Sequence, residues 1–196
     1  MTSVELDPHP SLPNIAMPTL KPTEVTSVYD GSLHRTRSMR LTGTRDAFFE
    51  DFAEGLVIET LRRTITEPDL VGFVQIAGLF EEIWLDAGKS ARIGLGGRAV
   101  PGGLTFAISE GLLVLTGSMG NAVGMLGIDN LRWSHPVCVG DTVHGRSKVT
   151  EARRSSSKPD RGVVTIAHQL LNQDNEVVLS YSSTRLIAAR GTEKCA

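Results

Sequence analysis

The pattern of hydrophobic and polar positions divides the chain near residue 45. The first 45 residues show little hydrophobic periodicity and carry prolines at positions 8, 10, 13, 18 and 22. This composition is typical of a segment that is extended or partly disordered. From residue 46 onward, apolar runs alternate with short polar turns. The sequence therefore predicts an arm over 1–45 and a single folded domain over 46–196.

The first part of this domain predicts a strand, a helix and an irregular excursion. Residues 56–65 form a run of strand type. Thr66 then stands as a helix N-cap, with a proline in the first turn and Asp69 three positions after the cap. Apolar residues at helical spacing extend this pattern to about Ala77. The next segment, 78–97, mixes acids, glycines and small residues and predicts irregular structure.

The second part predicts a long buried helix followed by antiparallel strands. Residues 102–116 are apolar around most of the helix circumference, as in a helix enclosed by a sheet. Four apolar runs follow, with turn residues between them: 125–133, 142–151, 163–172 and 177–188. This order predicts an α+β fold in which an antiparallel sheet surrounds one long helix.

Three stretches carry a resemblance to a known family. They are Ala77–Asp86, Gly96–Leu104 and Gly127–Thr142. Together they resemble the MaoC-like dehydratases, the family of the (R)-specific enoyl-CoA hydratases, over about residues 48–190. The resemblance implies a hotdog fold, with an antiparallel sheet wrapped around a long central helix. It also implies syn addition of water to a trans-2-enoyl thioester, and the reverse reaction.

The residues that perform this chemistry in the family are replaced here. The family pattern reads roughly Thr-Gly-Asp-x-Asn-Pro-x-His-x-Asp, and its Asp and His hold the water. Leu79 stands in place of that Asp and Trp84 in place of that His. Pro101 replaces the His that precedes the glycine at the start of the family's central helix. Ordinary hydratase activity is therefore in question.

Two groups of residues remain as site candidates. The amides of Gly102 and Gly103, at the positive end of the long helix, match an oxyanion site for the thioester, although glycines there also let a helix start close to a strand. Proton transfer needs ionisable groups, which typically contribute ~10²–10⁴ in rate. Glu81, Glu82 and Asp86 are the candidates, with a solvated surface loop as the alternative interpretation. Glu110 joins them if it faces the acyl tunnel.

Composition narrows the choice of function. The net charge of −2 gives no basic field for nucleic acid. Cys138 and Cys195 suggest neither a disulfide framework nor a metal site, and no phosphate-binding loop occurs, so no cofactor is implied. The five histidines fit structural or exposed positions better than catalytic ones. The sequence carries no long apolar run or leader pattern, and we expect a cytoplasmic protein.

Two functional hypotheses follow. The first is an enzyme acting on acyl-CoA or acyl-carrier-protein thioesters, either a hydro-lyase with relocated acid/base groups or a catalyst of a diverged reaction. The second is a non-catalytic acyl-binding subunit of a heteromeric MaoC-like dehydratase, with Leu79 and Trp84 lining its acyl tunnel. Because a lone hotdog domain would leave an open sheet edge, we expect a homodimer or a heteromer with another hotdog chain.

Overall fold

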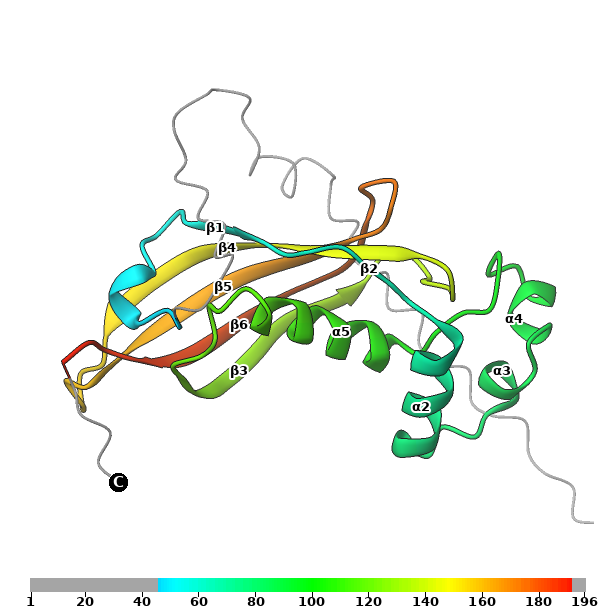
Figure 1. The fold of residues 1–196 in the computed structure, drawn as a ribbon, viewed down its shortest axis with the longest axis horizontal. Coiled ribbons are helices and arrows are strands. Elements are labelled where there is room, and N and C mark those ends of the chain that lie inside the picture. The colour runs from blue at the N-terminus through cyan, green and yellow to red at the C-terminus, as the bar shows by residue number, and fades with distance from the viewer. Residues whose placement is uncertain (1–45, 192–196) are drawn as a thin grey trace, which may run out of the picture. The chain divides into compact units, whose positions relative to one another are not determined.

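The computed structural model describes residues 46–191 (Figure 1). The predicted arm lies outside these residues. The elements, in chain order, are η1 (Phe49–Asp51), β1 (Val57–Glu59), β2 (Arg63–Thr64), α2 (Glu67–Ala77), α3 (Glu82–Leu85), α4 (Lys89–Arg92), α5 (Gly102–Val114), β3 (Ala122–Trp133), β4 (Thr142–Arg154), β5 (Arg161–Leu171) and β6 (Val177–Ala188). The predicted order of elements is confirmed.

The strands form one antiparallel sheet in the order β1-β4-β5-β6-β3, and β2 also pairs with β4. The hairpin between β5 and β6 turns at a polar tip, where the Asn172 amide donates to the Glu176 carbonyl oxygen over 3.0 Å. The strand predicted over 56–65 is interrupted at residues 60–62. Thr60 still bonds to β4, since its amide donates to the Gly145 carbonyl oxygen over 3.0 Å and its hydroxyl accepts from the Gly145 amide over 2.7 Å. The predicted strand appears as the separate strands β1 and β2.

Helix α2 begins as its sequence predicts. The Asp69 carboxylate accepts hydrogen bonds from the Thr66 amide over 2.9 Å and from the Thr66 hydroxyl over 2.8 Å. The helix ends at Gly78, which adopts a left-handed conformation with φ of 68°. The excursion that follows is not wholly irregular, since α3 and α4 each form a four-residue helix within it.

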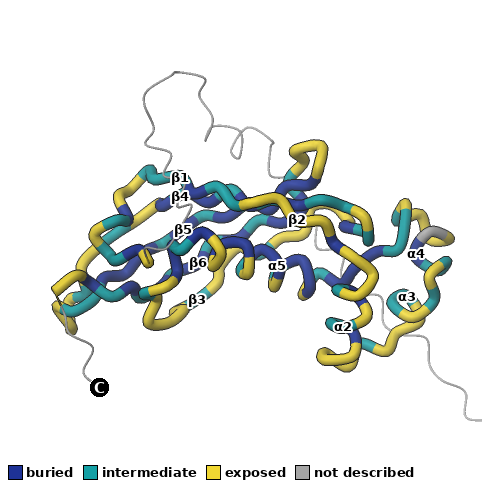
Figure 2. Tube along the Cα trace, viewed as in Figure 1, coloured by how far each residue is buried: buried dark blue, intermediate teal, exposed yellow. Residues whose placement is uncertain are grey.

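Helix α5 packs against the sheet along its length, and the buried positions run along the helix and the central strands (Figure 2). One core cluster joins Leu104 and Ile108 of α5 to Val143, Leu170 and Leu179 of β4, β5 and β6. This arrangement is the sheet-wrapped central helix that the sequence predicts.

Strand β3 lies at the edge of the sheet. It pairs with β6 on one side and, among the described residues, with no strand on the other. Most of its residues are exposed, including five large apolar side chains: Val123, Met125, Leu126, Ile128 and Trp133. An edge of this kind leaves unpaired backbone groups and apolar surface open to another chain.

Candidate active site

The start of α5 is covered by an indole ring. A Cβ atom on Gly102 would lie 2.7 Å from Nε1 of Trp133, so only glycine fits beneath the ring. The indole Nε1 donates to the Gly102 carbonyl oxygen over 3.1 Å and lies 3.2 Å from the Thr105 hydroxyl. Gly103 lies under Phe73 of α2, whose ring would be 3.1 Å from an added Cβ. The glycines therefore do let the helix start close to neighbouring side chains.

This packing leaves the amide donors of the first turn available. The first N–H groups of a helix have no acceptor within the helix. Trp133 binds the carbonyl of Gly102 and not its amide, and Leu104 is the first residue of α5 whose amide donates to Pro101, over 2.9 Å. The positive end of the helix dipole thus coincides with the N–H groups of Gly102 and Gly103.

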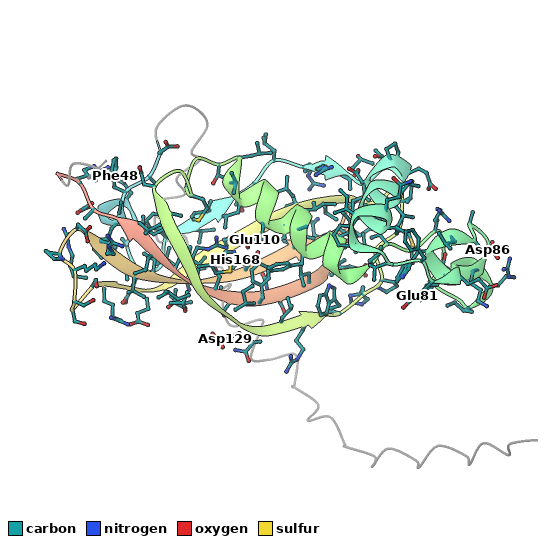
Figure 3. All side chains as sticks on the ribbon, turned by 90° about the horizontal axis from the view of Figure 1, so that it is seen from below. Phe48, Glu81, Asp86, Glu110, Asp129 and His168 are labelled. Carbon is teal, nitrogen blue, oxygen red and sulfur yellow. The ribbon has the colours of Figure 1, made fainter. Side chains whose placement is uncertain are left out.

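The three predicted proton-transfer acids lie on the excursion between α2 and α5, where Figure 3 labels Glu81 and Asp86. Glu82 forms an exposed ion pair with Lys89 at 2.8 Å. Asp86 forms an ion pair with Arg92 and accepts the Gly88 amide over 2.8 Å. The Arg92 hydrogen bond is the main cause that holds the pKa of Asp86 below its usual range. Glu81 has no ion pair among the described residues and accepts a hydrogen bond from Nε1 of Trp84 over 3.1 Å.

The two residues that replace the family's pair are both half-buried. The Leu79 amide donates to the Val74 carbonyl oxygen over 3.1 Å and closes the end of α2. Trp84 packs against the core cluster that contains α5. Its carbonyl oxygen accepts a hydrogen bond from Arg98 over 3.2 Å, and Arg98 also binds Glu67 at the start of α2. Arg98 therefore fixes α3 to α2.

A charged cluster lies between α5 and the sheet. Glu110 of α5 accepts hydrogen bonds from Nη2 of Arg185 over 2.8 and 2.6 Å and from the Tyr181 hydroxyl over 2.6 Å. The Ser109 hydroxyl lies 3.1 Å from the same Tyr181 hydroxyl. Glu110 was a conditional candidate in the sequence, whereas its partners on β6 carry no motif that could have revealed them.

A histidine extends this cluster into the core. His168 lies between the hydroxyls of Ser147 and Ser183, at 2.7 and 2.8 Å, and stacks on Tyr181 with ring centroids 4.5 Å apart. Burial lowers the pKa of His168 to about 3, and the charge of Arg185 adds to this shift. Burial also raises the pKa of the Tyr181 hydroxyl, and the hydrogen bond to Glu110 acts in the same direction. His168 is therefore a neutral, structural histidine near pH 7.

Comparison with known proteins identifies the family. The model of the MaoC like domain matches residues 51–170. The chain belongs to the MaoC-like dehydratase family.

Two curated relatives carry names of hydro-lyases. The chain is 33% identical over 135 residues to β-methylmalyl-CoA dehydratase of Chloroflexus aurantiacus, covering 68% of this chain and 38% of the relative. It is 39% identical over 72 residues to mesaconyl-CoA hydratase of Cereibacter sphaeroides, covering 37% of this chain and 21% of the relative. The chain thus spans well under half the length of either relative. The names of these relatives support the hydro-lyase class at the level of the family.

Solved structures support the fold. A MaoC-like dehydratase from Rhodospirillum rubrum is 31% identical, with a TM-score of 0.64 over 74% of this chain and 99% of that one. A Mycobacterium tuberculosis protein described as a double hotdog fold has a TM-score of 0.68 at 22% identity, over 76% of this chain and 46% of that one. The chain has the hotdog fold.

No group of three or more His, Cys, Asp or Glu side chains in residues 46–191 is arranged to hold a metal ion. No helix in the same range is long and apolar enough to cross a membrane.

Proposed function

We propose that the protein is a hydro-lyase acting on acyl-CoA or acyl-carrier-protein thioesters, with acid/base groups that differ from those of its family. The observation that carries the proposal is the family match over residues 51–170, combined with free amide donors at the start of α5. In the reaction, the thioester oxygen gains enolate charge and accepts hydrogen bonds from the amides of Gly102 and Gly103. Donors directed at developing charge are the largest single contribution in many such sites.

Proton transfer by Glu81, Glu82 or Asp86 stays a prediction. Glu82 and Asp86 already form ion pairs with basic side chains. The prediction therefore depends chiefly on Glu81. Its hydrogen bond to Trp84 couples it to the residue that stands in place of the family's histidine. A double variant with Glu81→Gln and Glu82→Gln tests the prediction, which fails if turnover is unchanged.

Thioester binding has a built-in reporter. The chain has two tryptophans, and one of them, Trp133, covers Gly102. A thioester bound at the first turn of α5 should change the intrinsic fluorescence, and Trp133→Phe should remove most of that change. Titration with butyryl-CoA, using free CoA as the control, measures this. Fluorescence that stays constant up to millimolar butyryl-CoA would refute the proposed site.

The expected partner is a second copy of the chain. The free edge of β3 and its exposed apolar residues support an interface there. In this proposal the protein is a cytoplasmic homodimer, and the free thiol of Cys138 fits a reducing compartment. Native mass spectrometry of the wild type and of Leu126→Lys tests the interface, since a buried lysine at this edge should shift the protein to monomer.

A second candidate function is the non-catalytic subunit, in which Leu79 and Trp84 only shape an acyl tunnel. It is favoured by the packing of Trp84 against the α5 core cluster, together with the ion pairs of Glu82 and Asp86. Co-purification with a second hotdog chain would support this role. A stable homodimer with turnover of its own would exclude it.

A further inference from the structure

One ridge of α5 presents three different chemical groups in order. Gly102, Phe106 and Glu110 follow at intervals of four residues, so they lie along one side of the helix. All three are half-buried. The axial distance from Gly102 to Glu110 is about 12 Å at 1.5 Å per residue, and helical side chains lean toward the helix start. An acyl group bound through its thioester at Gly102 and directed along this ridge would place its α- and β-carbons between Gly102 and the Glu110 carboxylate.

The carboxylate of Glu110 is held in one orientation but is not saturated. Its Oε1 accepts hydrogen bonds from Tyr181 and Arg185, whereas Oε2 accepts only from Arg185. A carboxylate oxygen can accept two hydrogen bonds, so Oε2 can accept one more. The Glu110 side chain is 20% exposed while that of Arg185 is 8% exposed. The pair is therefore reached from the Glu110 side.

The residues around the Glu110–Arg185 ion pair hold Arg185 and Tyr181 in place. Arg185 donates through Nε to the Ser183 hydroxyl over 3.0 Å, and Ser183 continues the chain to His168. Phe106 packs edge-on against Tyr181, with ring centroids 5.1 Å apart. A largely buried ion pair is weak evidence for stability, because desolvation offsets much of its attraction. A functional role therefore explains this ion pair better than a contribution to stability does.

We propose that Glu110 is the catalytic carboxylate that replaces the missing Asp/His pair, with Arg185 and Tyr181 as positioning residues. This inference rests on the proposed function and names a proton-transfer group for it. It competes directly with the prediction that Glu81, Glu82 or Asp86 fills this role.

The proposed step balances in protons and electrons. In hydration, Oε2 of Glu110 takes a proton from water while the water oxygen bonds to the β-carbon. The electron pair of the double bond moves toward the thioester oxygen, where the Gly102 amide stabilises the enolate. The protonated Glu110 then gives the proton to the α-carbon. One carboxylate on one side of the acyl group performs both transfers, and dehydration is the reverse.

The enolate half of this step can be tested without knowing the natural substrate. A base at Glu110 should exchange the α-hydrogens of butyryl-CoA with deuterium in D₂O, which mass spectrometry measures. We expect exchange in the wild type and a loss of about 100-fold or more in Glu110→Gln, the size of a lost acid/base group. Glu151→Gln, which removes an exposed carboxylate paired with Arg153, is the matched control and should exchange at the wild-type rate.

Two further variants separate a catalytic role from a structural one. Glu110→Asp retains the carboxylate and should recover part of the rate that Glu110→Gln loses. Tyr181→Phe keeps the ring contacts but removes one donor to Glu110. It should lower the exchange rate at saturation and leave the half-saturating butyryl-CoA concentration unchanged. Thermal melting verifies that each variant is folded, and Tyr181→Phe carries the test if Glu110→Gln does not fold.

The outcomes distinguish this inference from the function on which it rests. If butyryl-CoA does not change the tryptophan fluorescence, the proposed function fails and this inference fails with it. If butyryl-CoA binds but the wild type does not exchange, only the Glu110 inference is overturned. The same holds if Glu110→Gln exchanges at the wild-type rate, or if the Glu81/Glu82 double variant alone loses exchange.

Discussion

Acidification should destabilise the fold through His168. This side chain is 3% exposed, and both ring nitrogens are engaged by serine hydroxyls. Burial lowers its pKa from 6.5 to about 3, so the folded protein holds the ring neutral where the unfolded chain protonates it. A group with a lowered pKa in the folded state contributes stability above its unfolded pKa. That contribution is lost as the pH falls from about 6.5 toward about 3.

The size of the loss follows from these two pKa values. Between about pH 7 and about pH 5, the unfolded chain takes up nearly one proton at this position, and the folded protein takes up almost none. The linkage relation then gives a decrease of about 2 kcal/mol in the free energy of unfolding. The groups facing the ring are the Ser147 and Ser183 hydroxyls, the stacked Tyr181 and the charge of Arg185.

Urea unfolding of the wild type and of His168→Gln, each at both pH values, measures this contribution. Glutamine occupies similar space and can hydrogen-bond, but it does not titrate. Carboxylates that titrate in the same range are present in both proteins and cancel in the comparison. The free energy of unfolding should therefore fall by about 2 kcal/mol more in the wild type than in the variant. Equal pH dependence in the two proteins would refute the reasoning.

Three other variants test the fold and the helix start. Gly102→Ala should displace the Trp133 ring, because the new Cβ would lie 2.7 Å from Nε1; a fluorescence spectrum identical to that of the wild type would contradict this. Leu170→Ala, at a fully buried core position, should cost about 2–5 kcal/mol in urea unfolding, and a smaller cost would mean that the core closes around the cavity. Thr66→Ala removes the N-cap hydroxyl that donates to Asp69 and should lower the free energy of unfolding in urea by about 1 kcal/mol. An unchanged unfolding midpoint would show that the hydrogen bond from the Thr66 amide to Asp69 is sufficient.

Local signals in the sequence are sufficient to predict most of the helices and strands. The capping residues of α2 lie within four positions of one another, and α5 is marked by its apolar circumference. The polar tip at 172–176 is equally local. The interruption at residues 60–62 could not be predicted, because the pairing of this segment involves Gly145, 85 positions from Thr60.

The site was less predictable for the same reason. The resemblance to the family identified Gly102 and the acids of the excursion. It could not show that two of those acids form ion pairs, or that Trp133 covers the helix start from 31 positions away. The contact between Glu110 and Arg185 spans 75 positions. Contacts of this range depend on strand order and register, which apolar periodicity does not specify.

In the proposed function, this hotdog protein adds water to acyl thioesters, or removes it, without the family's Asp/His pair. The most direct measurement incubates the purified protein with a panel of trans-2-enoyl-CoA and 3-hydroxyacyl-CoA thioesters and follows the mass of each thioester. If the proposed function is correct, enoyl thioesters gain one water and hydroxyacyl thioesters lose one, at a rate proportional to protein concentration. Thioesters that bind, as shown by tryptophan fluorescence, but keep their mass throughout the panel would contradict it.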